Sequence, residues 1–354
     1  MKDLRNLKKP INIVYLVQLV LFGLVITGVL PREVSILMVV GLAIYFLFAS
    51  IEDAAIFFVM SIPLFIAIPI TADFDNFNTW RILSVILFFK LLHVTGLKYF
   101  LKINEYSRYA KLLLALLVLA VLSVIPAVDK ASAITRIIYF VNLSLPGIVV
   151  YCLFGGPTSK HEFGERLIKS ITVPTIIVTV VGFIQLASTY FIDIYQFMRI
   201  WGEGIQMRQF GVLWSEIAVK LGNTWFAYYG EQLSLRVFSL FPDSHSFPQF
   251  VLLGLPALFA ISLLRITNYP LRPPRIGETG QGFSEASELR ITNLMTMIRT
   301  RVSMNIVWVA LALLIAILSG TRGIWAASVG VVIIAGCTIF WQKKTSADIY
   351  HKNI

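Results

Sequence analysis

The chain has 354 residues, of which 57% are hydrophobic and 14% are charged, and its mean hydropathy is +0.80. Soluble domains are about 45–50% apolar and about 25% charged, so this composition excludes a soluble globular protein. The formal net charge is +11. In a soluble chain such an excess would suggest nucleic acid, but here it indicates positive loops on the cytoplasmic side of a membrane. We therefore expect membrane lipid around the chain and no nucleic-acid partner.

Metal and disulfide chemistry have little support in the sequence. The two cysteines, Cys152 and Cys337, both lie inside apolar runs, and the four histidines are scattered. A disulfide framework and a cysteine-based zinc site are therefore not expected. Asp73 and Asp75 form an Asp-x-Asp pair, which can hold a divalent metal with a diphosphate, but two asparagines close by favour a turn. We expect no metal and no cofactor.

Ten apolar runs are long enough to cross a bilayer as helices, the shortest only with snorkelling flanks. They cover residues 11–30, 34–50, 54–70, 82–97, 110–128, 133–154, 167–192, 246–264, 304–318 and 323–341. Only helices or closed barrels satisfy their backbone in lipid, and no alternating apolar and polar pattern is present. The sequence predicts an all-α, polytopic transmembrane bundle that forms a single membrane domain over residues 1–354. The first run reads as an uncleaved signal anchor.

The distribution of Lys and Arg sets the expected orientation. With the N-terminus inside, the inside segments carry 20 of these residues, whereas the outside segments and their borders carry nine. This excess predicts that both termini face the cytoplasm in a multi-pass protein of the cytoplasmic, or inner, membrane. The long loop 193–245, between spans seven and eight, then faces the periplasm or exterior. The loop 265–303, rich in Pro and Gly, is expected to be a flexible cytoplasmic linker.

The outer loop is rich in aromatic residues. They are Trp201, Trp214, Trp225, Phe226, Tyr228 and Tyr229. They could form an interfacial belt, which composition favours, or a platform for a sugar or a lipid-linked substrate. The stretch 206–222 predicts an amphipathic helix that lies on the membrane surface. Its expected apolar face consists of Phe210, Leu213, Ile217 and Leu221.

The end of this loop brings a cation, a carboxylate and an imidazole within ten residues, directly before a span. These are Arg236, Asp243 and His245. A histidine near pH 7 can take or give a proton, and Asp243 is close enough in sequence to hold its tautomer. The alternative is that Asp243, or a serine beside it, caps the helix that starts near Phe247. The two interpretations are compatible.

Three further arginines lie at the outer ends of spans, where the positive-inside rule disfavours cations. They are Arg81, Arg136 and Arg322, the last between two spans in the segment Ser-Gly-Thr-Arg-Gly of residues 319–323. Arginine suits bidentate contact with phosphate. Together with Arg236 these residues indicate an anion, such as a lipid-borne pyrophosphate. The alternative for Arg322 is an interfacial side chain that snorkels to lipid headgroups.

The order of these features resembles the O-antigen ligase and polymerase superfamily over about residues 110–341. The resemblance is carried by Arg236-x-x-x-Leu240, by the pair His245 and Gly254, and by the segment 319–323. The early stretches Ile-Pro-Leu-Phe-Ile-Ala-Ile-Pro and Asn-Thr-Trp-Arg are similar to members too. Two features depart from the family: one more residue separates His245 from Gly254 than in the ligase pattern, and the chain has fewer spans than is common.

The resemblance implies transfer of a glycan from an undecaprenyl pyrophosphate carrier to an acceptor hydroxyl, outside the cytoplasmic membrane. His245 would activate the acceptor as general base, while Arg236 and Arg322 would hold the pyrophosphate. Arg81, Arg136 and Asp243 are further candidates for contact with substrate. Ligases of this family use lipid A core as acceptor and polymerases use another lipid-linked repeat unit. The family needs no nucleotide and generally no metal.

Three alternatives stay open at the level of the sequence. A polymerase shares the topology of a ligase. A flippase or transporter of lipid-linked glycans would also suit ten spans, but it should show charged or broken helices near the bilayer centre and often internal repeats. Lys90 is the nearest charge to the bilayer centre, and no repeat is visible. A non-catalytic scaffold of envelope assembly would leave His245 and Arg322 dispensable.

Overall fold

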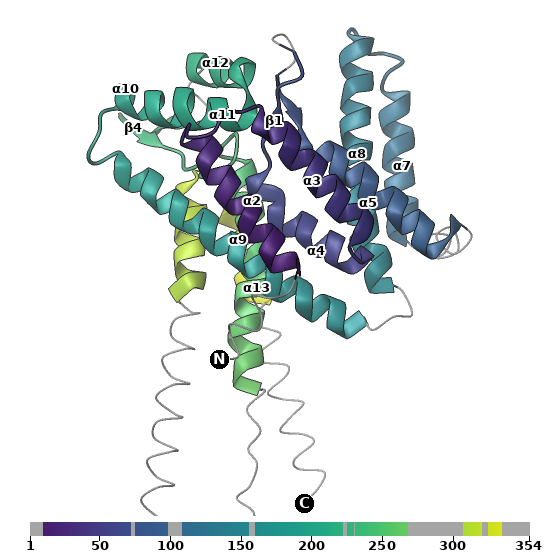
Figure 1. The fold of residues 1–354 in the computed structure, drawn as a ribbon. Coiled ribbons are helices and arrows are strands. Elements are labelled where there is room, and N and C mark those ends of the chain that lie inside the picture. Colours follow the sequence, from purple (N-terminus) through teal and green to yellow (C-terminus); the bar gives the residue numbers. More distant parts are fainter. Residues whose placement is uncertain are drawn as a thin grey trace, which may run out of the picture. The chain divides into compact units, whose positions relative to one another are not determined.

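The structure is a computed structural model, and it is mostly helical, which confirms the all-α prediction. It describes residues 10–71, 75–97, 108–155, 160–221, 225–229, 231–267, 307–320 and 325–334. Figure 1 shows its helices and strands, coloured along the sequence. The chain divides into two compact units. Unit 1 consists of Met1–Leu167 and Asp193–Leu221, and unit 2 of Ile168–Ile192 and Gly222–Ile354. The outer loop 193–245, expected as one segment of a single domain, is thus shared between the units.

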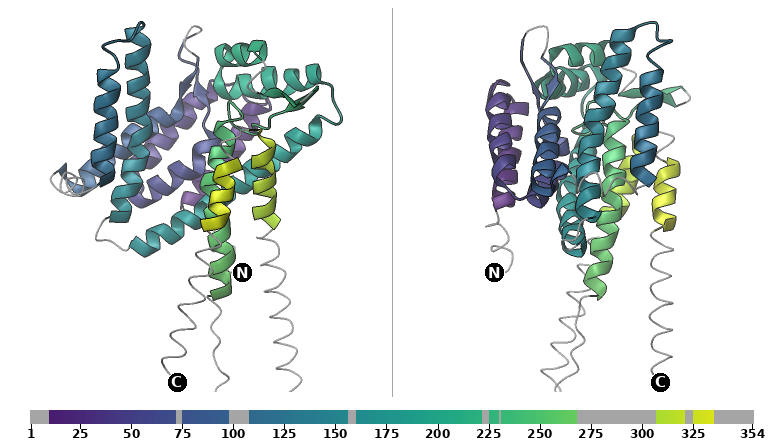
Figure 2. Two further views of the ribbon diagram at one scale, coloured as in Figure 1. Left: turned by 180° about the vertical axis from the view of Figure 1, so that it is seen from behind. Right: turned by 90° about the vertical axis from the view of Figure 1, so that its right-hand side faces the viewer.

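Unit 1 holds the N-terminal helices and the first half of the outer loop. Its elements are α2 (Pro10–Ile26), α3 (Val34–Phe48), α4 (Ile51–Ser61), η1 (Ile62–Leu64), β1 (Ala67–Ile68), β2 (Phe77–Asn78), α5 (Thr79–Thr95), α7 (Arg108–Leu122), α8 (Lys130–Gly155), the first turns of α9 (Lys160–Ser188), α10 (Ile194–Phe197), the π-helix η2 (Met198–Gln206), α11 (Met207–Phe210) and α12 (Val212–Leu221). Figure 2 shows α7 and α8 as a neighbouring pair from two further sides.

The run 54–70 does not form one continuous helix as expected. Helix α4 starts at a Ser50 cap, whose hydroxyl accepts the amide of Asp53 at 3.1 Å, and it ends at Ser61. A 3₁₀ turn with Pro63 and the two-residue strand β1 follow. Strand β1 pairs antiparallel with β2. Proline cannot donate a backbone hydrogen bond and disfavours helix in the residue before it, so Pro63 and Pro69 account for the break.

Polar side chains join helices of unit 1 across their apolar faces. The hydroxyl of Ser61 donates to Gln18 Oε1 at 2.6 Å, which links α4 to α2. The hydroxyl of Ser84 donates to Asn142 Oδ1 at 2.7 Å, which links α5 to α8. Such pairs are typical of helices packed in lipid, where burial of apolar surface alone does not drive association.

Unit 2 holds the rest of α9, the hairpin of β3 (Phe226–Tyr229) and β4 (Gln232–Leu235), and α13 (Ser246–Thr267). Two later helices cover Val307–Leu318 and Trp325–Ile334. A Cβ added at Gly254 in α13 would lie 2.0 Å from Thr175 Oγ1 in α9. The two helices therefore approach so closely that only glycine fits at this position.

Two helices, Lys130–Phe154 and Glu162–Ser188, are long and apolar enough to cross a membrane. The other predicted runs contain shorter helices, such as α2 and α5 with 17 residues each. A helix of that length measures about 26 Å, somewhat less than the ~30 Å hydrocarbon core. The structure thus supports a membrane protein in the coarse sense, and the arrangement of ten spans stays a prediction.

Candidate functional site

Arg236 and His245 lie together at the loop between β4 and α13, within unit 2. Nη2 of Arg236 is 3.4 Å from Nε2 of His245. The same guanidinium donates from Nε to the backbone oxygen of Ser319, also at 3.4 Å. Ser319 opens the segment Ser-Gly-Thr-Arg-Gly, so the first part of the third motif joins the site. Arg322 itself lies outside the described residues.

A buried glutamine in α9 fixes the loop that carries Arg236 and His245. Oε1 of Gln185, in α9, accepts hydrogen bonds from the amides of Phe238 at 2.9 Å and Ser239 at 3.0 Å. Ser239 has a φ of 51°, a region that non-glycine residues rarely adopt. Its hydroxyl donates to the backbone oxygen of Val178 at 2.7 Å. These three bonds stabilise an uncommon backbone turn between Arg236 and His245.

Trp225 packs against the same loop through an apolar and a polar contact. Its ring stacks on Phe238 with centroids 4.8 Å apart, and Nε1 donates to the backbone oxygen of Pro242 at 3.2 Å. Trp225 is completely buried, and Trp201 in unit 1 is 7% exposed. Neither ring is available to stack on a sugar or to lie in the lipid interface. Of the outer-loop aromatics, Tyr228 is well exposed, at 72%.

Asp243 caps helix α13 and does not contact the imidazole of His245. Oδ1 accepts the amides of His245 and Ser246 at 2.8 Å each, and Oδ2 accepts the Ser246 hydroxyl at 2.9 Å. The capping interpretation is therefore confirmed. Among the described residues, the imidazole contacts Arg236, and a role of Asp243 in setting its tautomer stays a prediction.

Arg81 and Arg136 belong to unit 1, where aromatic rings surround the first of them. The Arg81 guanidinium lies 4.1 Å from the centroid of Tyr139 and within 6 Å of two further rings, Phe77 and Trp80. Cation–π contacts of this kind offset part of the charge. Tyr139 stands one helical turn after the exposed Arg136 in α8. The rings give Arg81 a structural contact, and its binding of an anion stays a prediction.

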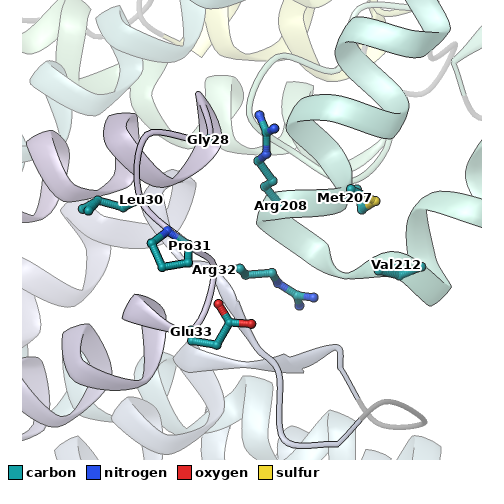
Figure 3. Close-up of a pocket in the computed structure, with 8 residues that line it drawn as sticks. All are labelled: Gly28, Leu30, Pro31, Arg32, Glu33, Met207, Arg208 and Val212. Atoms are coloured by element: carbon teal, nitrogen blue, oxygen red, sulfur yellow. The ribbon is translucent and has the colours of Figure 1, made fainter.

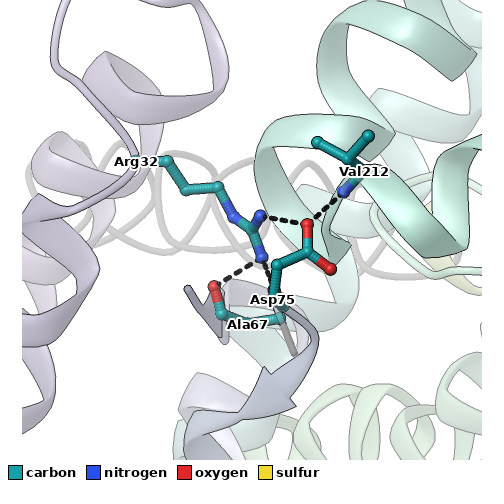
Figure 4. A network of polar contacts seen from close by, with 4 residues as sticks. All are labelled: Arg32, Ala67, Asp75 and Val212. Carbon is teal, nitrogen blue, oxygen red and sulfur yellow. Dashed lines mark hydrogen bonds and ion pairs between the residues drawn. The ribbon is translucent and has the colours of Figure 1, made fainter. Parts of the chain in front are cut away.

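Asp75, from the Asp-x-Asp pair, forms a buried ion pair (Figure 4). Its Oδ2 is 3.0 Å from Arg32 Nη1 and accepts the amide of Val212 at 2.5 Å. Arg32 also donates to the backbone oxygen of Ala67 at 3.0 Å. Asp75 therefore holds three segments of unit 1 together. Asp73 lies outside the described residues, and within the described part of the chain no three His, Cys, Asp or Glu side chains gather as metal ligands would.

Lys90, the charge closest to the expected bilayer centre, has a structural role. Its Nζ donates to the backbone oxygens of Phe46 and Leu47 at 2.8 Å each. Those carbonyls end helix α3, where the helix dipole favours a cation. These two hydrogen bonds account for the position of a charged side chain within α5, and they do so without a role for Lys90 in transport.

Two residues of the site were not singled out from the sequence. Gln185 fixes the loop, and Thr175 sits against Gly254. A polar amide in the middle of the apolar run 167–192 was the available signal, since polar groups inside a membrane segment are costly and usually have a partner. No signal in the sequence identified Thr175, because threonine is common in such helices.

The site offers an imidazole beside a guanidinium, on a loop that a buried network fixes. A guanidinium can bind phosphate oxygens in a bidentate way, and an imidazole can exchange a proton near neutral pH. Neither a family model, nor a curated protein, nor a solved structure matches the chain. The geometry and the sequence motifs therefore carry the functional argument.

Proposed function

We propose that the chain is a membrane glycan transferase of the O-antigen ligase type. It would move a glycan from an undecaprenyl pyrophosphate carrier to an acceptor hydroxyl at the outer face of the cytoplasmic membrane. The observation that carries this proposal is the 3.4 Å contact between Arg236 and His245, the two motif residues to which the family resemblance assigns anion binding and base catalysis.

Exposed apolar surface supports the membrane setting. Leu37 and Phe48 in α3 are 72% and 87% exposed, and many other apolar side chains along the helices share this exposure. Soluble monomers rarely expose contiguous apolar patches of more than a few hundred Å². A lipid environment accounts for these faces, and the excess of Lys and Arg in the other loops directs the loop of His245 to the outside.

The chemistry proceeds as one displacement. His245 takes the proton from the acceptor hydroxyl, and the acceptor oxygen forms a bond to the anomeric carbon of the donor sugar. The bond from that carbon to the pyrophosphate oxygen breaks, and its electron pair leaves with the pyrophosphate. Arg236 and Arg322 stabilise the negative charge that develops on the leaving group. The donor glycan is already activated by its pyrophosphate, so no nucleotide takes part.

Arg236 has two tasks in this scheme. Without substrate its guanidinium faces the imidazole, and with donor bound it turns to the pyrophosphate. This movement releases the lone pair of Nε2 for the acceptor hydroxyl. Binding of the donor therefore frees His245 to act as a base. Proton transfer then takes place only when the donor is bound.

The test is release of undecaprenyl pyrophosphate from a lipid-linked oligosaccharide by the full chain reconstituted in lipid. Wild type, His245→Ala and His93→Ala are compared, each with and without acceptor; His93 is an exposed histidine in the last turn of α5. We expect acceptor-dependent release by wild type and His93→Ala. A general base contributes about 10²–10⁴-fold, so His245→Ala should lose at least about a hundredfold.

The choice of acceptor separates the two enzyme classes. Release that needs lipid A core indicates a ligase, and release that needs a second lipid-linked unit indicates a polymerase. Equal release by wild type and His245→Ala, or no release by folded wild type with either acceptor, contradicts the proposal. Movement of the lipid-linked oligosaccharide across the same vesicles without release would indicate a flippase.

A further inference from the structure

A small cavity of about 240 Å³ lies within unit 1, apart from any residue assigned to the transfer (Figure 3). One wall is the turn between α2 and α3, and the other consists of residues of α11 and the start of α12. The lining residues are Gly28, Leu30, Pro31, Arg32, Glu33, Met207, Arg208 and Val212. Arg32 and Arg208 would suit an anion site, but the groups that they already contact disfavour one.

The charges around the cavity nearly cancel. Arg32 is paired with Asp75 at 3.0 Å, so its charge is already compensated. Arg208 donates from Nη1 to the backbone oxygen of Ile26 at 3.1 Å, at the C-terminal end of α2, where the helix dipole supplies about half a negative charge. Glu33 adds a carboxylate. A phosphate or pyrophosphate would meet this carboxylate without an uncompensated cation to offset it.

The Glu33 carboxylate and the Arg208 guanidinium can form hydrogen bonds with the hydroxyl groups of a ligand. Glu33 is exposed, and its carboxylate makes no hydrogen bond to the described residues, so it can accept from a ligand. Arg208 has five N–H groups, and its recorded bond to Ile26 leaves donors for a ligand. Its guanidinium lies against Gly28, where an added Cβ would be only 2.6 Å from Arg208 Cζ. The Arg208 guanidinium thus reaches the turn that also carries Glu33, so a donor and an acceptor both border the cavity.

Apolar side chains complete the lining. Pro31, Met207 and Val212 add carbon surface to the lining. A sugar ring offers the complementary pattern, with hydroxyl groups at its edge and C–H groups on its faces. Ligand sites in general combine mostly apolar walls with a few placed polar groups.

We propose that this cavity binds an uncharged sugar residue of the glycan, with Glu33 accepting from its hydroxyls and Arg208 donating to them. This inference rests on the proposed function, because it takes the glycan as the substrate. It adds a glycan subsite formed by the turn after α2 and by the α11–α12 segment. It also states a preference: neutral sugars bind, and acidic sugars or pyrophosphate bind weakly or not at all.

The test measures binding without turnover. The full chain in lipid nanodiscs is mixed with the neutral trisaccharide of N-acetylglucosamine, with a trisaccharide that contains a uronic acid, or with inorganic pyrophosphate, and binding is measured by saturation-transfer NMR. The variants are Val212→Trp, which fills the cavity, and Glu33→Ala. Their controls are Leu213→Trp, next to Val212 on α12 but not in the lining, and Glu216→Ala, an exposed acid on the same helix.

We expect the neutral trisaccharide to bind to wild type and to both controls. Binding should vanish in Val212→Trp and weaken at least about tenfold in Glu33→Ala, the usual effect of losing one hydrogen bond to a charged group. Absence of neutral-sugar binding, equal binding by Val212→Trp and wild type, or stronger binding of pyrophosphate that depends on Val212 overturns the proposal.

The two proposals can fail separately. Release of undecaprenyl pyrophosphate by wild type, together with no sugar binding sensitive to Val212, removes the subsite and leaves the transferase. Sugar binding that Val212→Trp abolishes, without any release, removes the transferase and leaves a sugar-binding cavity in a membrane protein.

Discussion

Nη2 of Arg236 lies 3.4 Å from Nε2 of His245, the imidazole nitrogen farther from the backbone. A guanidinium has five donors and no acceptor, so the contact needs a lone pair on Nε2. In the neutral ring that lone pair exists when the proton is on Nδ1, and the partner of one nitrogen sets the state of the other. A hydrogen bond from Arg236 to His245 thus predicts that Nε2 is the basic atom.

Arg236→Ala should change the tautomer of His245. With ¹⁵N-labelled histidine in the reconstituted protein, at a pH at which the ring is neutral, we expect the Nδ1–H form to dominate in wild type. The variant should show a mixture of both forms, because the donor to Nε2 is gone. The His245→Ala spectrum assigns the signal, and Arg136→Ala, at an exposed arginine, should leave it unchanged. A dominant Nε2–H form in wild type would contradict the assignment.

Gly254→Ala should destabilise the protein. The added Cβ would lie 2.0 Å from Thr175 Oγ1 and 2.8 Å from Thr175 Cβ, so α13 and α9 must separate. Overpacking of this kind typically costs about 1–3 kcal/mol. The measurement is the free energy of unfolding in the same detergent or lipid for each variant.

A matched control for this prediction is Gly23→Ala in α2, where an added Cβ meets nothing within 4 Å. We expect no loss of stability there, because alanine favours helix over glycine by about 1 kcal/mol. Thr175→Ala should restore part of the stability of Gly254→Ala, and the two changes should be non-additive. Equal effects of the two glycine changes would mean that the helices are not in close contact.

The apolar runs predicted the helices well, since each run contains a described helix. They did not predict where the run 54–70 breaks, because apolar content masks the effect of Pro63 and Pro69. The runs also miss the helix ends, since these depend on caps such as Ser50, which starts α4 three residues before its run, and caps are short-range signals outside the apolar pattern.

The site was predictable where its residues are close in sequence. Arg236 and His245 are nine residues apart, and the structure brings them into contact. The contact of Arg236 with Ser319 spans 83 residues, and that of Gln185 with Ser239 spans 54. Contacts at such separation depend on how helices pack, which no local pattern encodes. Asp243 had two compatible interpretations from the sequence, and the geometry of its oxygens confirms the cap.

Asp75→Asn should destabilise unit 1 strongly. The side chains of Asp75 and Arg32 are only 8% and 12% exposed, so the variant leaves a buried guanidinium without its counter-ion. Breaking a buried ion pair typically costs about 3–5 kcal/mol, and we expect a loss near 3 kcal/mol in the free energy of unfolding. The control is Glu216→Gln, whose pair with Lys220 is well exposed at 3.7 Å and should contribute less than about 1 kcal/mol.

The same variant tests the metal interpretation of the Asp-x-Asp pair. If Asp75 acted as a metal ligand, a chelator would lower the stability of wild type, and added Mn²⁺ would raise it. We expect neither effect, because the Asp75 carboxylate is bound by Arg32 and by the Val212 amide. A chelator effect that disappears in Asp75→Asn would refute the structural role.

The orientation can be tested with single cysteines. After Cys152 and Cys337 are replaced by alanine, one cysteine is introduced at Tyr228, exposed in the outer loop, or at Lys352 near the C-terminus. The charge distribution predicts that an impermeant maleimide labels Tyr228→Cys in intact cells and Lys352→Cys only after permeabilisation. The reverse pattern would place the loop of His245 in the cytoplasm and exclude transfer at the outer face.

Gln185→Leu should disturb the loop that carries Arg236 and His245. The change removes the acceptor for the amides of Phe238 and Ser239, and each buried amide left without a partner costs about 1–3 kcal/mol. We expect lower stability and a clear loss of transfer. Gln185→Glu keeps acceptor oxygens and should retain more activity than the leucine variant.

The control for Gln185 is Thr179→Val in the same helix. Thr179 is buried too, but its hydroxyl bonds to the backbone oxygen of Thr175 within α9, so it does not reach the loop. The valine variant should therefore keep the His245 tautomer and the transfer rate, whereas Gln185→Leu should lose both. Equal behaviour of the two variants would show that the glutamine stabilises α9 without fixing the loop, and the position of His245 would then need another cause.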